Sequence, residues 1–175
     1  MVTMLVIVIV VALVGVLSVA ASRPDTFRVE RSIIVAAPQE TVQALIEDFH
    51  RWVDWSPWEK LDPALQRQYS GQPLGLGAIY EWNGNNKVGQ GRMEIIEALP
   101  GKVLIQLDFF RPFKASNKAE FQLEPATGGT QVSWAMYGPS PFISKLMSLV
   151  ASMDKMVGKD FERGLAQMKA AAEGR

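Results

Sequence analysis

The chain has 175 residues, and its 18 basic and 18 acidic side chains leave no net charge. Without a basic excess to neutralise phosphates, nucleic-acid binding is disfavoured. Cysteine is absent, which excludes disulfides and thiolate chemistry. The single histidine, His50, cannot build a nitrogen-rich metal site, so we predict neither a metal nor another cofactor.

Residues 1–22 form the first element, an apolar stretch with no charge between Thr3 and Ala21. An uncharged run of this length matches the hydrocarbon thickness of a bilayer, so we predict a single-pass membrane anchor. The alternative is a cleaved signal sequence, because Ser18-Val19-Ala20 resembles a small-residue cleavage site. The arginines that follow favour a cytoplasmic domain by the positive-inside rule, but acidic residues alternate with them, and the side of the membrane stays open.

Residues 23–175 are predicted to form one domain. Phe27 to Val35 alternates as a strand does, and Ala37-Pro38-Gln39-Glu40 then opens a short helix. Further strands joined by tight turns are predicted within 66–70, 78–82, 88–99, 103–109, 117–123 and 130–137. Hairpin connections of this kind imply an antiparallel sheet.

The last long stretch, Pro141 to Ala172, repeats apolar residues every three or four positions. This period predicts one amphipathic helix, roughly 45–50 Å long at about 1.5 Å per residue. Gly158 and Gly164 lie within it, and each costs about 1 kcal/mol relative to alanine. They favour a close approach to the sheet, although a bend that opens a pocket is the alternative.

Together these elements predict an α+β fold: a curved antiparallel sheet of six to seven strands around a long C-terminal helix, plus the N-terminal transmembrane helix. A helix that lies in a curled sheet need not fill it. The gap then becomes a ligand cavity.

The element order resembles the polyketide cyclase/dehydrase-like branch of the START and birch-pollen-allergen superfamily, in particular a subgroup with an N-terminal anchor. The residues that carry the resemblance are 29–33 with 37–38, 48–52, 55–58, 89–91, 112–114, 128–132 and 153–165. The resemblance extends from about Phe27 to Ala172. It implies the helix-grip (START/Bet v 1-like) fold and the binding of hydrophobic small molecules, and it transfers no set of catalytic residues.

The candidate site residues are aromatic, methionine and valine side chains on the predicted inner faces: Trp55, Trp58, Tyr80, Trp82, Met93, Phe109, Phe121, Trp134, Met136, Met153 and Val157. Such side chains suit an adaptable apolar pocket. Ordinary core packing is the alternative, and for the cluster of Trp52, Trp55 and Trp58 it is favoured.

We therefore expect a membrane-anchored domain that binds a hydrophobic or amphipathic, lipid-like small molecule by burying it. An enzyme of cyclase or hydrolase type is the second hypothesis, and it requires a buried pocket carboxylate. His50 lacks an evident partner for catalysis. The third hypothesis is a ligand-free interaction module, which predicts a filled interior.

Overall fold

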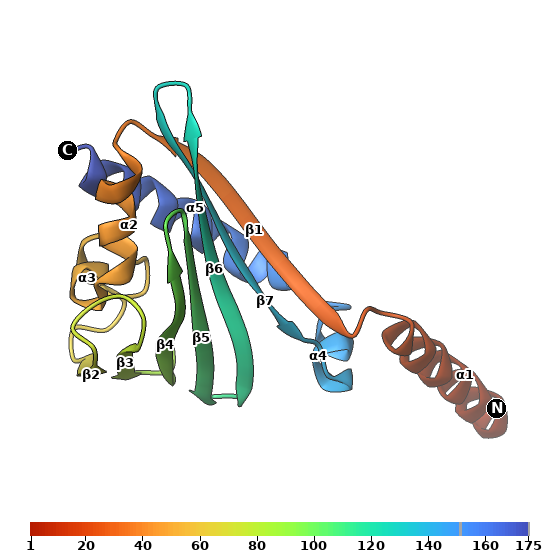
Figure 1. Ribbon diagram of the computed structural model, residues 1–175. Helices are drawn as coiled ribbons and strands as arrows, with labels where there is room; N and C mark the ends of the chain where they lie inside the picture. The colour runs from red at the N-terminus through yellow and green to blue at the C-terminus, as the bar shows by residue number, and fades with distance from the viewer. Residues whose placement is uncertain (151, 175) are drawn as a thin grey trace.

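The computed structural model describes residues 1–150 and 152–174 of the chain. Figure 1 shows one domain with a single helix projecting from it. In chain order the elements are α1 (Val2–Ala21), β1 (Thr26–Val35), α2 (Gln39–Glu47), η1 (Phe49–Arg51), α3 (Trp52–Trp55), β2 (Gln66–Gly71), β3 (Ala78–Asn83), β4 (Gln90–Leu99), β5 (Lys102–Arg111), β6 (Ala115–Ala126), β7 (Gly129–Pro139), α4 (Phe142–Met147) and α5 (Met153–Ala172).

The seven strands form one antiparallel sheet in the order β1-β7-β6-β5-β4-β3-β2, which confirms the predicted fold class. Consecutive strands from β2 to β7 are joined by hairpins, and β1 closes on β7. Register shifts in the β4–β5 pair, at Gln90/Gly91 and at Ile95/Glu97, add local twist. The curved sheet holds α5 against one face (Figure 1).

The register defines two ends of this sheet. At one end Thr26 pairs with Pro139, Phe109 with Ala115, and Asn83 with Gln90. We call it the mouth end. The β3–β4 turn, the β5–β6 turn, α4 and the exit of α1 all lie there, whereas α2 and the β4–β5 and β6–β7 turns lie at the opposite, closed end (Figure 1).

The tryptophan-rich segment closes the C-terminal end of α2. The indole N–H groups of Trp52 and Trp55 donate to the carbonyl oxygens of Ile46 and Leu45, both at 3.0 Å. These carbonyls lie in the last turn of a helix, where main-chain partners run out. The two tryptophans thus hold the short helices together while their rings enter the core.

The prediction of one helix from Pro141 to Ala172 is wrong in one respect, because the structure has two helices there, α4 and α5. Ser148 Oγ donates to the Lys145 carbonyl at 2.6 Å, and Ser152 Oγ accepts from the Lys155 amide at 3.3 Å as the N-cap of α5. Serine side chains compete in this way with the main-chain helix ladder. The apolar periodicity continues across the break, and so it hid the interruption.

Helix α5 runs without a break through both of its glycines. A Cβ on Gly164 would lie 2.8 Å from Cζ3 of Trp134 and 3.0 Å from Cδ of Pro57. A Cβ on Gly158 would overlap the guanidinium of Arg31, which is held by Asp154 and Glu162. Close packing, the favoured interpretation, is therefore why glycine occupies both positions.

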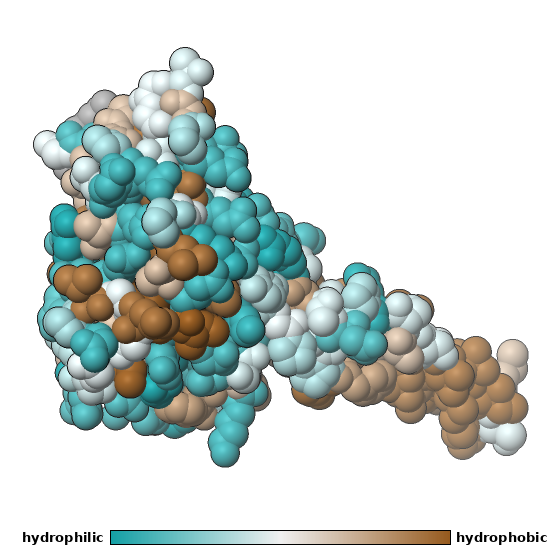
Figure 2. Space-filling view, in the orientation of Figure 1, coloured by the Kyte–Doolittle hydropathy of each residue, from teal (hydrophilic) through white to brown (hydrophobic). Residues whose placement is uncertain are grey.

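Helix α1 is the one described helix that is long and apolar enough to cross a membrane. Its side chains are exposed along almost the whole length, and Figure 2 shows it as a hydrophobic rod leaving a mainly hydrophilic domain. A signal sequence meets the same criteria of length and hydropathy.

Candidate functional site

A cavity of about 210 Å³ lies between the inner face of the sheet and α5. A water needs only about 10–15 Å³ of such volume, so the space far exceeds a few waters. The filled interior that a ligand-free module predicts is not found. Seventeen residues line the cavity: Trp52, Ser56, Trp58, Glu59, Leu65, Tyr80, Trp82, Lys87, Val88, Met93, Leu107, Phe109, Ala119, Trp134, Met136, Val157 and Phe161.

Most of the sequence-predicted site residues lie on this wall. The structure brings together Trp58, Tyr80, Trp82, Met93, Phe109, Trp134, Met136 and Val157. Trp55 and Phe121 are fully buried behind the wall, where their rings meet edge to face at 6.0 Å. Met153 packs against the core at the start of α5 and is not a lining residue.

Several lining residues were missed by the sequence reasoning. Leu107 and Ala119 share a strand face with the predicted residues Phe109 and Phe121, so the alternation could have found them. Phe161 follows Val157 by one helical turn, which is the corresponding signal on α5. Ser56, Glu59 and Leu65 come from the irregular segment between α3 and β2, which carries no period.

Glu59 is the buried acidic group of the cavity wall, with only 7% of its surface exposed. Its Oε1 accepts the Tyr80 hydroxyl hydrogen at 2.6 Å, and its Oε2 accepts from Nε of Arg67 at 2.7 Å. Arg67 also donates to the Glu59 carbonyl at 3.1 Å. The charge is thus paired and both carboxylate oxygens are engaged, as a buried carboxylate requires.

Burial and the hydrogen bond to Glu59 raise the pKa of Tyr80 well above its usual value. The hydrogen bond to Glu59 is the main cause that raises the pKa of Arg67. The phenol therefore stays protonated and donates to the carboxylate. Glu59 and Tyr80 thus form a fixed polar spot on an otherwise largely apolar wall, and Arg67 holds Glu59 from outside the lining.

Trp134 is the centre of the aromatic wall. Its ring stacks on Phe161 at 4.1 Å with an interplanar angle of 4°, and Trp58 meets it edge-on at 5.8 Å. The Trp134 ring is 2% exposed, yet its Nε1 has no hydrogen-bond partner among the described residues. A buried donor without a partner costs about 1–3 kcal/mol.

His50 lies outside the cavity lining. Its ring stacks on Tyr69 at 4.0 Å, and its Nδ1 is 3.1 Å from Oδ1 of Asp48 on the exposed surface. The geometry gives this imidazole no access to a molecule in the cavity.

Comparison with known proteins agrees with the architecture. The family model described as polyketide cyclase/dehydrase and lipid transport matches residues 26–173. No curated protein matches the chain in sequence.

Solved structures show the same fold at low identity. Protein CV1439 from Chromobacterium violaceum is 16% identical with a TM-score of 0.56, over 86% of this chain and 99% of that one. The di-domain ARO/CYC StfQ from the steffimycin biosynthetic pathway is 10% identical with a TM-score of 0.63, over 86% of this chain and 51% of that one. Ara h 8.0201 is 13% identical with a TM-score of 0.56, over 86% of this chain and 99% of that one.

Proposed function

Because the chain belongs to the polyketide cyclase/dehydrase and lipid-transport family, we propose that it binds an amphipathic, lipid-like molecule in the cavity while α1 anchors it in a membrane. The observation that carries the proposal is the cavity of about 210 Å³, whose wall is mainly aromatic and aliphatic. Each CH₂ group moved from water into such a space contributes about 0.8 kcal/mol.

The polar groups of the wall favour an amphipathic occupant over a pure hydrocarbon. The buried Trp134 indole N–H has no partner in the described part of the chain, so a carbonyl or hydroxyl oxygen on the ligand would satisfy it. Lys87 is exposed and lines the cavity on the β3–β4 turn, where it suits a polar or anionic head. A ligand with one polar end and one apolar tail meets both requirements.

Native mass spectrometry of the detergent-extracted chain with oleic acid as probe tests this proposal. Ala119 lines the cavity from β6, so Ala119→Phe should fill the cavity and lower the bound fraction on the order of tenfold. Gln122→Phe places the same ring on the exposed face of the same strand, and it should bind as the wild type does. Equal binding by the two variants, or no adduct with the wild type, would overturn the proposal.

An enzyme of cyclase or hydrolase type is the second candidate, because Glu59 supplies the buried carboxylate that such an activity needs. Both of its oxygens already accept hydrogen bonds, which favours a role in positioning over one as a general base. Glu59→Gln separates the two candidates. A bound molecule that the wild type returns chemically altered, and Glu59→Gln returns unchanged, would favour the enzyme.

A further inference from the structure

The mouth end of the sheet exposes a group of large apolar side chains on two separate elements. Phe113 in the β5–β6 turn is 72% exposed, and Val150 after α4 is 91% exposed. The members of this group, which we call the apolar rim, are Phe110, Phe113, Phe142, Ile143, Met147 and Val150. Large apolar side chains that are exposed at one end of a domain are candidates for contact with a partner or a membrane.

The apolar rim lies next to the point where α1 leaves the domain. The Ser140 amide donates to the Asp25 carbonyl, and Nζ of Lys145 donates to Oδ1 of Asp25, both at 2.6 Å. Ala20 in the last turn of α1 is fully buried, and α1 contacts α4. These contacts hold α4 beside the C-terminal end of α1. The exposed face of α4 is therefore fixed in position relative to the apolar helix α1.

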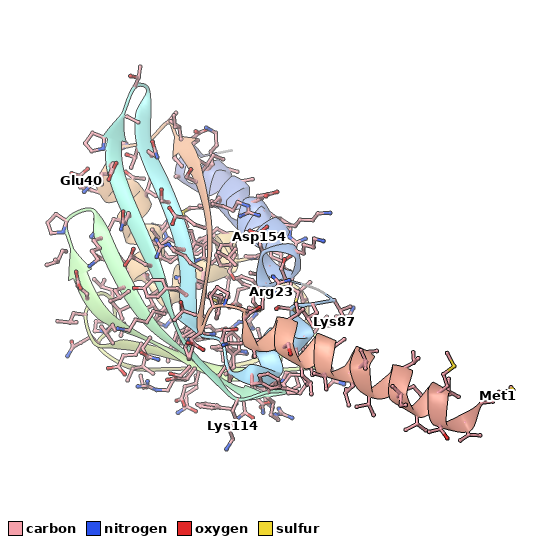
Figure 3. The ribbon with its side chains drawn as sticks, turned by 90° about the vertical axis from the view of Figure 1, so that its right-hand side faces the viewer. Met1, Arg23, Glu40, Lys87, Lys114 and Asp154 are labelled. Atoms are coloured by element: carbon pink, nitrogen blue, oxygen red, sulfur yellow. The ribbon has the colours of Figure 1, made fainter. Side chains whose placement is uncertain are left out.

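Basic side chains accompany the apolar rim. Arg23, Lys87, Arg111 and Lys114 are all exposed at this end, and Figure 3 shows Lys87 and Lys114 there, with Glu40 at the opposite end. Asp25 and Asp154 are paired with Lys145 and Arg31, whereas Asp108 accepts hydrogen bonds from Gln106 and Ser116. The combination suits a surface with anionic headgroups over an apolar layer.

We propose that the mouth end docks on a lipid bilayer containing anionic lipids, an inference that rests on the membrane anchoring proposed above. The apolar rim enters the boundary between headgroups and acyl chains, and the basic side chains contact the headgroups. Lys87 and Val88 line the cavity from this same end, so docking brings this part of the cavity wall next to the lipid. An amphipathic ligand then passes between bilayer and cavity without crossing water.

The absence of cysteine makes single-cysteine labelling direct. Met147→Cys and Phe113→Cys probe the apolar rim, and Thr127→Cys in the exposed β6–β7 turn is the matched control at the closed end. Each full chain carries a nitrobenzoxadiazole label in phosphatidylcholine vesicles, with and without phosphatidylglycerol. We expect blue-shifted emission and quenching by spin-labelled lipid at the first two positions only, stronger with phosphatidylglycerol.

Equal quenching of all three labels by aqueous iodide would overturn the proposal. A blue shift that grows with the protein-to-lipid ratio, without quenching by spin-labelled lipid, would also overturn the proposal. It would show that a second copy of the chain, and not lipid, covers the apolar rim. Oleic acid binding by the detergent-extracted chain is measured independently of the vesicles. Loss of lipid contact with oleic acid binding retained therefore refutes docking alone, and the reverse result refutes the cavity function alone.

Discussion

The two ends of the sheet are built in different ways. At the closed end, side chains tie loops together: Gln43 accepts from the Gly101 amide and donates to the Leu99 carbonyl, both at 2.9 Å. Thr130 Oγ1 donates to the Ala37 carbonyl at 2.9 Å, and this hydroxyl is buried. These contacts join α2 and the segment before it to the β4–β5 turn and to β7.

The mouth end also has side-chain ties, such as the hydrogen bond from Arg111 Nε to Gln90 Oε1 at 2.9 Å, but it exposes the rings of Phe110, Phe113 and Phe142. Its cavity replaces packed core, and the contact between Lys145 and Asp25 attaches α4 to the segment that follows α1. The contrast suggests that the closed end supplies stability and the mouth end supplies binding. Functional regions are commonly drawn from the less stable part of a fold.

Trp55→Ala offers the largest test of this contrast. The ring is fully buried behind the cavity wall, and its indole caps the Leu45 carbonyl of α2, which lies at the closed end. We expect the free energy of unfolding to fall by about 3–5 kcal/mol, as for other large-to-small core changes. Chemical denaturation of the detergent-solubilised chain measures it. Trp58→Ala is the control in the cavity wall. An equal loss of unfolding free energy in that variant would contradict the assignment of stability and binding to different parts of the fold.

Gly164→Val should have the next largest effect. A Cβ at this position already comes within 2.8 Å of a ring carbon of Trp134 and 3.0 Å of Pro57, so a branched side chain forces a displacement. We expect a loss of about 2–3 kcal/mol in the free energy of unfolding, seen in the same denaturation experiment. Arg163→Ala, one residue away on the exposed face, should change it by no more than about 0.5 kcal/mol.

The raised pKa of the Tyr80 hydroxyl leads us to expect that the free energy of unfolding depends on pH in the alkaline range. Burial and the hydrogen bond to Glu59 raise its pKa in the folded state, so its contribution is complete below the unfolded value of about 10. That contribution is lost as the pH rises above this value toward the folded pKa. Denaturation curves on both sides of about pH 10 should show a steeper loss for the wild type than for Tyr80→Phe. Parallel losses would refute the assignment.

The smallest expected effect concerns the clasp that Arg31 makes with α5. Its guanidinium lies 2.8 Å from carboxylate oxygens of both Asp154 and Glu162, and the hydrogen bond from Arg31 lowers the pKa of Asp154. This contribution is present above the usual carboxyl value of about 4 and is lost as the pH falls below it. Arg31→Met should flatten the acid limb of the stability profile slightly. High salt should have the same effect as Arg31→Met, since it screens the charges of the two solvent-exposed carboxylates.

The sequence was sufficient for the sheet, because strict alternation and glycine-containing turns mark each strand locally. It was also sufficient for the inner-face residues of β3 to β7, because alternate residues of a strand lie on the same face. Once one inner-face residue is identified, the others follow. Glu59 and Ser56 could not be predicted in the same way. They reach the cavity through an irregular segment whose path depends on contacts with Tyr80 and Arg67.

The break before α5 illustrates a different limit. Apolar spacing reports which face of a helix is buried, whereas helix ends depend on a few polar contacts. Ser148 and Ser152 supply such contacts, and Lys145 pairs with a residue 120 positions earlier in the chain. A partner that distant cannot be read from periodicity.

Strand β2 forms one margin of the sheet, and its composition bears on self-association. An open margin offers unpaired main-chain groups to any neighbouring strand, a hazard that grows where molecules are confined to a surface. The strand spans only Gln66–Gly71, most of its side chains are polar and exposed, and its arginine is engaged with Glu59. Molecules crowded together in two dimensions would thus remain discrete rather than join into continuous sheets.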